Sequence, residues 1–226
     1  MPLLWGRNYT RAELMERIGD ISQVGGVRSY RIDGGPGDGL AIVQLDTGAG
    51  LRFTVVPGRA LDISGAWYKD IPIGYRTPTG EVDGARYEPE GQGWIRTTVL
   101  GLLVTGGLDN VGNPASEDEE AFGLHGRISN LAASNVYADG EWRNDEYIMW
   151  VQGRVRQAAL FGENLELKRR ISASLGSTFL PFSAPPSCLD APNLPILTLA
   201  SLSPCFTSAL LHPRYLSASL GSTFLP

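Results

Sequence analysis

The sequence predicts an all-β fold of antiparallel strands, with one short helix near the N-terminus. Two observations favour this class. Apolar and polar side chains alternate with a period of two over long stretches, which is typical of half-buried strands. Turns rich in glycine separate these stretches, and signals for helices vanish after Gly19. Many strands joined by tight turns are typical of an antiparallel sandwich or barrel.

The predicted helix begins at the stretch TRAE, residues 10–13, which fits a capping box. In this motif the threonine hydroxyl and the glutamate three residues later accept hydrogen bonds from each other's backbone amides. Leu14, Met15 and Ile18 then form one short apolar face, and Gly19 is expected to end the helix. We expect the chain beyond this helix to form strands.

Two hairpins are expected along the remaining globular sequence. Residues 39–63, GLAIVQLDTGAGLRFTVVPGRALDI, form two strands joined by a turn at DTGAG. Later in the chain, the turn FGEN at 161–164 joins two strands whose side chains alternate with a period of two. The residues expected to share one face are Tyr147, Met149, Val151 and Val155 on the first strand and Leu165, Leu167, Arg169 and Ile171 on the second.

The composition changes sharply after Gly176. Residues 1–176 read as the globular portion of a sandwich domain, whereas proline, serine and leucine dominate residues 177–226. Frequent prolines exclude regular helices and central strands there. The decapeptide SASLGSTFLP also occurs twice, at 172–181 and at 217–226. The tail is therefore either a poorly ordered segment or the product of a duplication, a misjoined reading or an out-of-frame end.

Charge and composition narrow the function classes. A net charge of −5 and a pI near 5.1, with no basic stripe, argue against nucleic acid as a partner. No apolar run is long enough for a membrane span, and the N-terminus lacks a signal peptide, so a cytoplasmic protein is expected. Cys188 and Cys205 lack the spacing of metal ligands, and we expect neither metal nor cofactor.

Three stretches place long polar side chains beside glycines, which lets a ligand approach the backbone. They are PGRALDI at 57–63, GLLVTGGLDNVGNP at 101–114 and GLHGRISN at 123–130. Planar donors and acceptors of this kind bind sugars, and histidine adds a group that titrates near neutral pH. The candidates expected to converge on one concave surface are Arg59, Asn110, His125 and Arg127.

Each candidate also has a purely structural interpretation. His125 can cap a strand or fill a buried niche, and the arginines can be surface charges. Asn110, between glycines, can be a turn residue with a positive φ. The acidic run EDEE at 117–120 is expected in a solvated loop, and the five tryptophans in the core. The residues alone therefore support a β-sandwich with a polar cleft.

Six motifs that follow one another along the chain resemble those of a known family. They are GDISQVGGVRSY, GLRFTVVPGRALDIS, YEPEGQGWIR, GGLDNVGNP, FGLHGRISNLAA and LFGENLELKRRIS. Together they resemble aldose 1-epimerase-like bacterial proteins, in the branch described as a domain of unknown function. The resemblance covers about residues 4–176. It implies the antiparallel β-supersandwich of galactose mutarotase, incomplete in this chain.

The resemblance also implies a substrate and residue roles. In mutarotases a histidine donates a proton to the ring oxygen of a sugar, and a carboxylate takes the proton of the anomeric hydroxyl. The motif LHGR implies that His125 is catalytic and that Arg127 binds substrate. Similar matches imply that Asn110, Arg59 and Asp62 also bind a small-molecule sugar or sugar derivative. The sequence specifies neither the sugar nor an oligomeric state.

Departures from the family pattern leave two functions open. Gly58 and Ala60 stand where the family usually has an acidic residue and a glycine. The family's second histidine and its late carboxylate are also missing. His212 does not match that histidine, because it precedes Pro213 and lacks the family's following asparagine. The first function is an aldose 1-epimerase-like isomerase, which is the family-level interpretation. The alternative is a truncated, non-catalytic protein that is carbohydrate-binding or vestigial.

Overall fold

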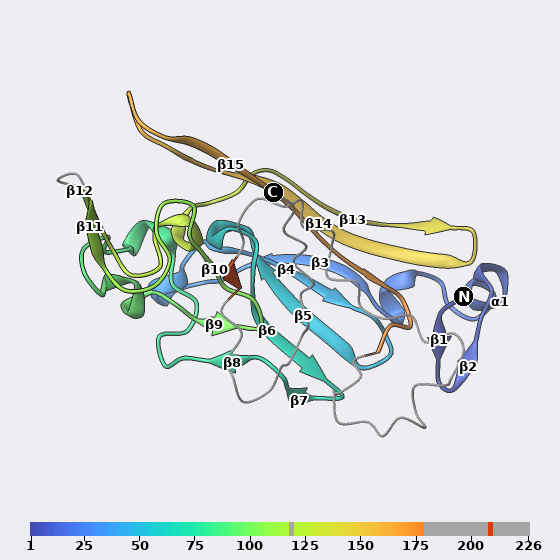
Figure 1. Ribbon diagram of the computed structural model, residues 1–226. Helices are drawn as coiled ribbons and strands as arrows, with labels where there is room; N and C mark the ends of the chain where they lie inside the picture. Colours follow the sequence, from blue (N-terminus) through green and yellow to red (C-terminus); the bar gives the residue numbers. More distant parts are fainter. Residues whose placement is uncertain (118–119, 179–207, 210–226) are drawn as a thin grey trace, which may run out of the picture.

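Two antiparallel sheets packed face to face form the body of the protein in the computed structural model (Figure 1). The structure describes residues 1–117, 120–178 and 208–209. One sheet has the strand order β3-β4-β5-β6-β7, and the other has the order β13-β14-β15. This architecture confirms the predicted all-β antiparallel class.

The larger sheet is a meander in which consecutive strands are neighbours. Its strands are β3 (Gly26–Arg31), β4 (Ala41–Asp46), β5 (Leu51–Val56), β6 (Asp62–Tyr68) and β7 (Ile71–Pro72). The β4–β5 hairpin turns at the predicted DTGAG stretch. Between β5 and β6 the chain runs through Ala60 and Leu61, whose φ angles are 52° and 60°. These left-handed residues make the sharp corner that carries the PGRALDI stretch.

The smaller sheet consists of three long strands, β13 (Ser134–Arg143), β14 (Glu146–Ala158) and β15 (Asn164–Ser174). The predicted alternation holds, since Met149, Val151 and Val155 are fully buried on one face of β14. On β15 the neighbours Lys168 and Arg170 are exposed, whereas Arg169 points inward and is buried. A buried arginine on an otherwise apolar face requires an anionic partner or acceptor inside the protein.

The main hydrophobic core lies between the two sheets. It combines Phe53 and Val55 of β5 with Met149 and Val151 of β14, all at most 1% exposed. Burying a side chain of this size contributes about 1.5–3 kcal/mol. Leu14, from the N-terminal segment, packs on the same cluster. The core therefore holds the N-terminal helix and both sheets together.

The predicted helix is present but shorter than expected. Helix α1 (Arg11–Met15) begins at the Thr10 cap, and both hydrogen bonds of the predicted capping box are present. It ends at Met15 and does not reach Ile18, which packs on the core from outside the helix. A five-residue helix leaves most of its backbone groups at the termini, so the cap and the burial of Leu14 hold it in place. No helix in the described part of the chain is long and apolar enough to cross a membrane.

The remaining elements are short. The strands not yet given are β1 (Leu3–Leu4), β2 (Arg7–Asn8), β8 (Tyr75–Arg76), β9 (Leu100–Gly101), β10 (Thr105–Gly106), β11 (Ala115–Glu117), β12 (Glu120–Phe122) and β16 (Ser208–Ala209). Between β7 and β13 the chain forms loops, short strands and 3₁₀ turns, and Figure 1 shows β11 and β12 at one end of the sandwich. This connecting segment carries the second and third polar stretches.

Within the compositionally distinct tail, the structure describes residues 177–178 and β16. Strand β16 pairs with β10 in the antiparallel sense, with Thr105 opposite Ala209. The predictions for the rest of the tail concern positions outside the described residues. These positions include Cys188, Cys205, His212 and the second copy of the repeat.

Candidate functional site

Two loops of the connecting segment interlock, and they carry three of the predicted site residues. The loops are residues 107–113 and 123–127. The backbone amide of His125 donates to Gly112 O at 2.9 Å, and His125 O accepts from the Gly107 amide at 3.0 Å. Asn110, His125 and Arg127 are therefore brought together by pairing between the two loops.

Gly126 is the tightest point of this junction. Its φ is +71°, and a Cβ there would lie 2.3 Å from Asp109 Oδ1 and 2.7 Å from the carbonyl oxygen of Asn110. Only glycine has both the conformational freedom and the space that this contact requires. The glycine of LHGR thus lets loop 107–113 close against loop 123–127.

The His125 side chain is held in one tautomer. Its Nδ1 accepts a hydrogen bond from the Gly112 amide at 3.1 Å, so the proton of a neutral imidazole is on Nε2. The Trp94 ring meets the imidazole edge-on, with ring centroids 4.8 Å apart. Burial lowers the pKa of His125 below its usual value of 6.5. Near neutral pH the imidazole is therefore uncharged, and Nε2–H is a hydrogen-bond donor without a partner among the described residues.

Asn110 ties the loops together through its side chain. Its Nδ2 donates to Gly123 O at 2.7 Å, and its backbone amide donates to Asp109 Oδ1 at 2.8 Å. The first bond occupies one side-chain donor, whereas the carbonyl oxygen of the amide has no partner among the described residues. Asn110 can therefore bridge the loops and still accept a hydrogen bond.

Arg127 is the half-exposed charge of the cluster, with 43% of its side chain accessible. Its Nε lies 3.4 Å from Asp109 Oδ2, and its Nη2 lies 3.0 Å from Glu163 Oε1. Glu163 belongs to the FGEN turn between β14 and β15. The arginine thus connects the loop cluster to the smaller sheet.

Arg59 lies in the interior, beneath this cluster. It is 5% exposed and donates to three backbone carbonyls, those of Ser129 and Thr97 at 2.6 Å and that of Val82 at 2.9 Å. Ser129 also accepts from the Trp94 indole at 2.9 Å through its hydroxyl. Arg59 therefore supports the cluster through Ser129 and Trp94, and its guanidinium binds carbonyls of the protein itself.

Asp62 is likewise interior, at 3% exposure. It accepts hydrogen bonds from the Thr105 amide at 3.1 Å and from the Thr105 hydroxyl, and its Oδ1 pairs with Arg169 Nη1 at 3.0 Å. Burial raises the pKa of Asp62, while Arg169 and the Thr105 donors act in the opposite direction. The same Arg169 nitrogen also donates to Ala60 O at 2.7 Å. Asp62 thus joins β6 to β10 and β15.

The structure adds three residues that were not among the predicted site residues, namely Asp109, Glu163 and Trp94. Asp109 and Glu163 lie within two of the six motifs, GGLDNVGNP and LFGENLELKRRIS. Their proximity to Arg127 depends on a separation of 36 positions between Arg127 and Glu163, which no local pattern encodes. Trp94, expected in the core, is 5% exposed and packs against the His125 ring in a T-shaped arrangement.

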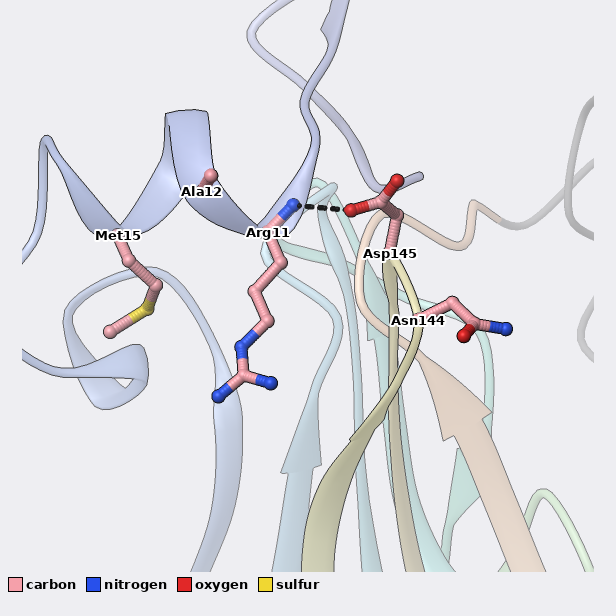
Figure 2. A pocket seen from close by; sticks show the side chains of 5 residues that line it. All are labelled: Arg11, Ala12, Met15, Asn144 and Asp145. Atoms are coloured by element: carbon pink, nitrogen blue, oxygen red, sulfur yellow. Dashed lines mark hydrogen bonds between the residues drawn. The ribbon is translucent and has the colours of Figure 1, made fainter.

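Two hollows on the described surface lie elsewhere. One, of about 620 Å³, is lined by residues of α1 and the β13–β14 turn, including Arg11 and Asp145 (Figure 2). In that hollow the Arg11 amide donates to Asp145 Oδ1 at 2.9 Å. Another lies between β4 and β13, with Pro57 and Gly58 in its wall. Neither hollow is lined by a predicted site residue. Within the described ranges, no three His, Cys, Asp or Glu side chains gather as metal ligands would.

Comparisons with known proteins match both the sequence and the fold. The family model described as a domain of unknown function, DUF4432, matches residues 37–183. No curated protein matches the sequence. The crystal structure of a proposed aldose 1-epimerase from Klebsiella pneumoniae subsp. pneumoniae superposes with a TM-score of 0.61 at 21% sequence identity. The match covers 74% of this chain and 47% of that one, so the chain spans about half of that protein's length. At this identity the likeness shows the fold.

Proposed function

Because the chain belongs to the DUF4432 family and has an aldose 1-epimerase-like fold, we propose that it binds a small sugar at the interlocked loops 107–113 and 123–127. The sugar would contact His125, Asn110 and Arg127. Arg59 and Asp62 would hold these loops from beneath rather than touch the sugar, since both are almost fully buried and bonded to protein groups.

The hydrogen bond from the Gly112 amide to His125 Nδ1 is the observation that carries this proposal. It fixes the orientation of the ring and leaves Nε2–H as a donor. A sugar hydroxyl or ring oxygen accepts from such a donor, while the side-chain carbonyl of Asn110 can accept from a neighbouring hydroxyl. Neutral hydrogen bonds contribute about 0.5–1.5 kcal/mol each, so a few of them support a dissociation constant in the millimolar range.

A second candidate function is interconversion of sugar anomers by proton transfer. It is favoured by the place of His125 in the LHGR motif. A general acid at the ring oxygen must carry a transferable proton, however, and the lowered pKa of His125 keeps its imidazole neutral near pH 7. The described residues therefore support binding more strongly than turnover, and His125 is proposed as the donor that orients the sugar.

Replacing His125 tests the binding proposal. Asparagine is the appropriate substitute, because His125 has a φ of +58° and asparagine tolerates this conformation. Calorimetric titration of D-glucose and D-galactose should show binding to the wild-type chain and loss of at least about fivefold in affinity for His125→Asn. The matched control is Asp33→Ala, an exposed side chain between β3 and β4. Equal affinity of the His125→Asn and wild-type chains, with both folded by thermal melt, would refute the proposed site.

A further inference from the structure

The charges around Arg127 give the proposed sugar site an acidic character. Across the two loops Arg127 is the one cationic side chain and Asp109 the one carboxylate. Glu163 adds a second carboxylate from the β14–β15 turn, 3.0 Å from Arg127 Nη2. One guanidinium thus faces two carboxylates, and His125 contributes no charge near neutral pH.

Asp109 is fixed in this arrangement. Its side chain is 9% exposed, Oδ1 accepts from the Asn110 amide at 2.8 Å, and Oδ2 faces Arg127 Nε at 3.4 Å. Oδ1 occupies the space beside Gly126, where a Cβ would lie 2.3 Å from it. An anionic ligand that approaches Arg127 would therefore find the guanidinium already paired with Asp109.

Glu163 is the accessible partner. Its side chain is 27% exposed, and Oε1 faces Arg127 while Oε2 has no hydrogen-bond partner among the described residues. The surroundings are acidic as well. The Tyr87 hydroxyl, which donates to Gly126 O at 3.3 Å, has a raised pKa, first because of burial and then because of Asp109. A cation at this position would find an open carboxylate oxygen, and the one positive side chain on the two loops, Arg127, faces the other oxygen of Glu163.

We infer that Asp109 and Glu163 select the charge of the ligand, so that this surface takes protonated amino sugars in preference to sugars that carry a carboxylate or phosphate. The inference rests on the proposed function, and it makes Glu163 a specificity-determining residue. An anionic sugar must displace a carboxylate from Arg127 to gain an ion pair, and it then lies beside that carboxylate. An ammonium group would instead form an ion pair with Glu163 Oε2, and the ion pairs of Arg127 with Asp109 and Glu163 would stay intact.

The test compares three hexose derivatives of different charge on the full chain near pH 7. The sugars are D-glucosamine, its uncharged derivative N-acetyl-D-glucosamine and D-glucuronate. We expect D-glucosamine to bind about fivefold tighter than the other two, which is the range of an exposed ion pair. Glu163→Gln keeps the shape of the side chain and removes its charge. This variant should abolish the preference for D-glucosamine. It should also strengthen D-glucuronate binding, because Arg127 Nη2 then lacks its ion pair with Glu163.

Glu166→Gln is the matched control, since Glu166 is exposed on β15, just beyond the turn that carries Glu163, and pairs with Lys168 at 3.4 Å. It should leave the order of affinities unchanged. A second readout needs no variant: raising NaCl from about 20 mM to about 500 mM should reduce the preference of the wild-type chain for D-glucosamine by screening.

Two outcomes would overturn the inference and are distinguishable from each other. If D-glucuronate binds the wild-type chain as tightly as D-glucosamine, or if Glu163→Gln retains the preference, charge selection fails while sugar binding stands. If none of the three sugars binds and His125→Asn changes nothing, the proposed function fails, and the inference fails with it.

Discussion

At the scale of single residues, Gly126 decides whether the two loops can close. Its φ is positive, and a Cβ would overlap Asp109 Oδ1 at 2.3 Å. Gly112 offers a matched comparison, because its φ is +104° and a Cβ there would meet nothing within 4 Å. The two positions share the left-handed conformation and differ in the space around them.

We expect Gly126→Ala to lower the free energy of unfolding by about 2–4 kcal/mol, the sum of backbone strain and overpacking. Gly112→Ala should lower the free energy of unfolding by the backbone strain alone, about 1–2 kcal/mol. Denaturant titration measures both. Equal losses would show that Asp109 does not occupy the position next to Gly126.

His125 should make stability depend on pH. Its folded-state pKa is lowered from 6.5 by burial, so the unfolded chain binds the proton more tightly. Stability from this group is therefore complete above about pH 6.5 and is lost as the pH falls through the folded-state pKa. Protonation also places a hydrogen on Nδ1, which ends the bond from Gly112. Below about pH 6.5, the melting temperature should fall more steeply with decreasing pH for the wild-type chain than for His125→Asn. Parallel curves would contradict the assigned tautomer.

At the scale of elements, the corner between β5 and β6 is fastened by buried charges. Asp62 pairs with Arg169 of β15, and Arg169 also donates to Ala60 O. Two strands from different sheets are joined here, and the left-handed corner at Ala60 and Leu61 brings Asp62 into position. The ion pair is 3% and 4% exposed, so either charge would be costly without the other.

Removing one partner of this pair tests its role. Arg169→Met should lower the free energy of unfolding by about 3–5 kcal/mol, because it leaves Asp62 buried without a counter-charge. The double variant Arg169→Met/Asp62→Leu should recover part of that loss. Lys168→Met, on the exposed face of the same strand, is the control and should change stability by less than about 0.5 kcal/mol. A double variant as unstable as the sum of its single variants would contradict the coupling.

Alternating patterns predicted the long strands well, whereas long-range contacts escaped prediction. The faces of β14 and β15, the turn at DTGAG and the capping box at Thr10 all follow from local spacing. The burial of Arg59 does not, since its acceptors lie 23, 38 and 70 positions away. Motifs identified the residues of the candidate site, but only the fold separates the surface members from the buried ones.

At the scale of the whole molecule, the two packed sheets form the base, and the connecting segment between β7 and β13 supplies the polar loops (Figure 1). Arg59, Trp94 and Ser129 connect the base to His125 through hydrogen bonds and a ring contact. In the proposed function, this arrangement presents a neutral imidazole, an amide and a paired guanidinium to a sugar.

Saturation-transfer NMR of D-glucose with the full chain tests this claim most directly, because the same spectra report binding and the ratio of α and β anomers. We predict transfer from protein to sugar for the wild-type chain and its loss for His125→Asn. Starting from freshly dissolved α-D-glucose, the anomer ratio should relax at the uncatalysed rate. Absence of transfer from a folded wild-type chain, or equal transfer from His125→Asn, would contradict the sugar site. Accelerated relaxation of the anomers would instead show that the chain turns its ligand over.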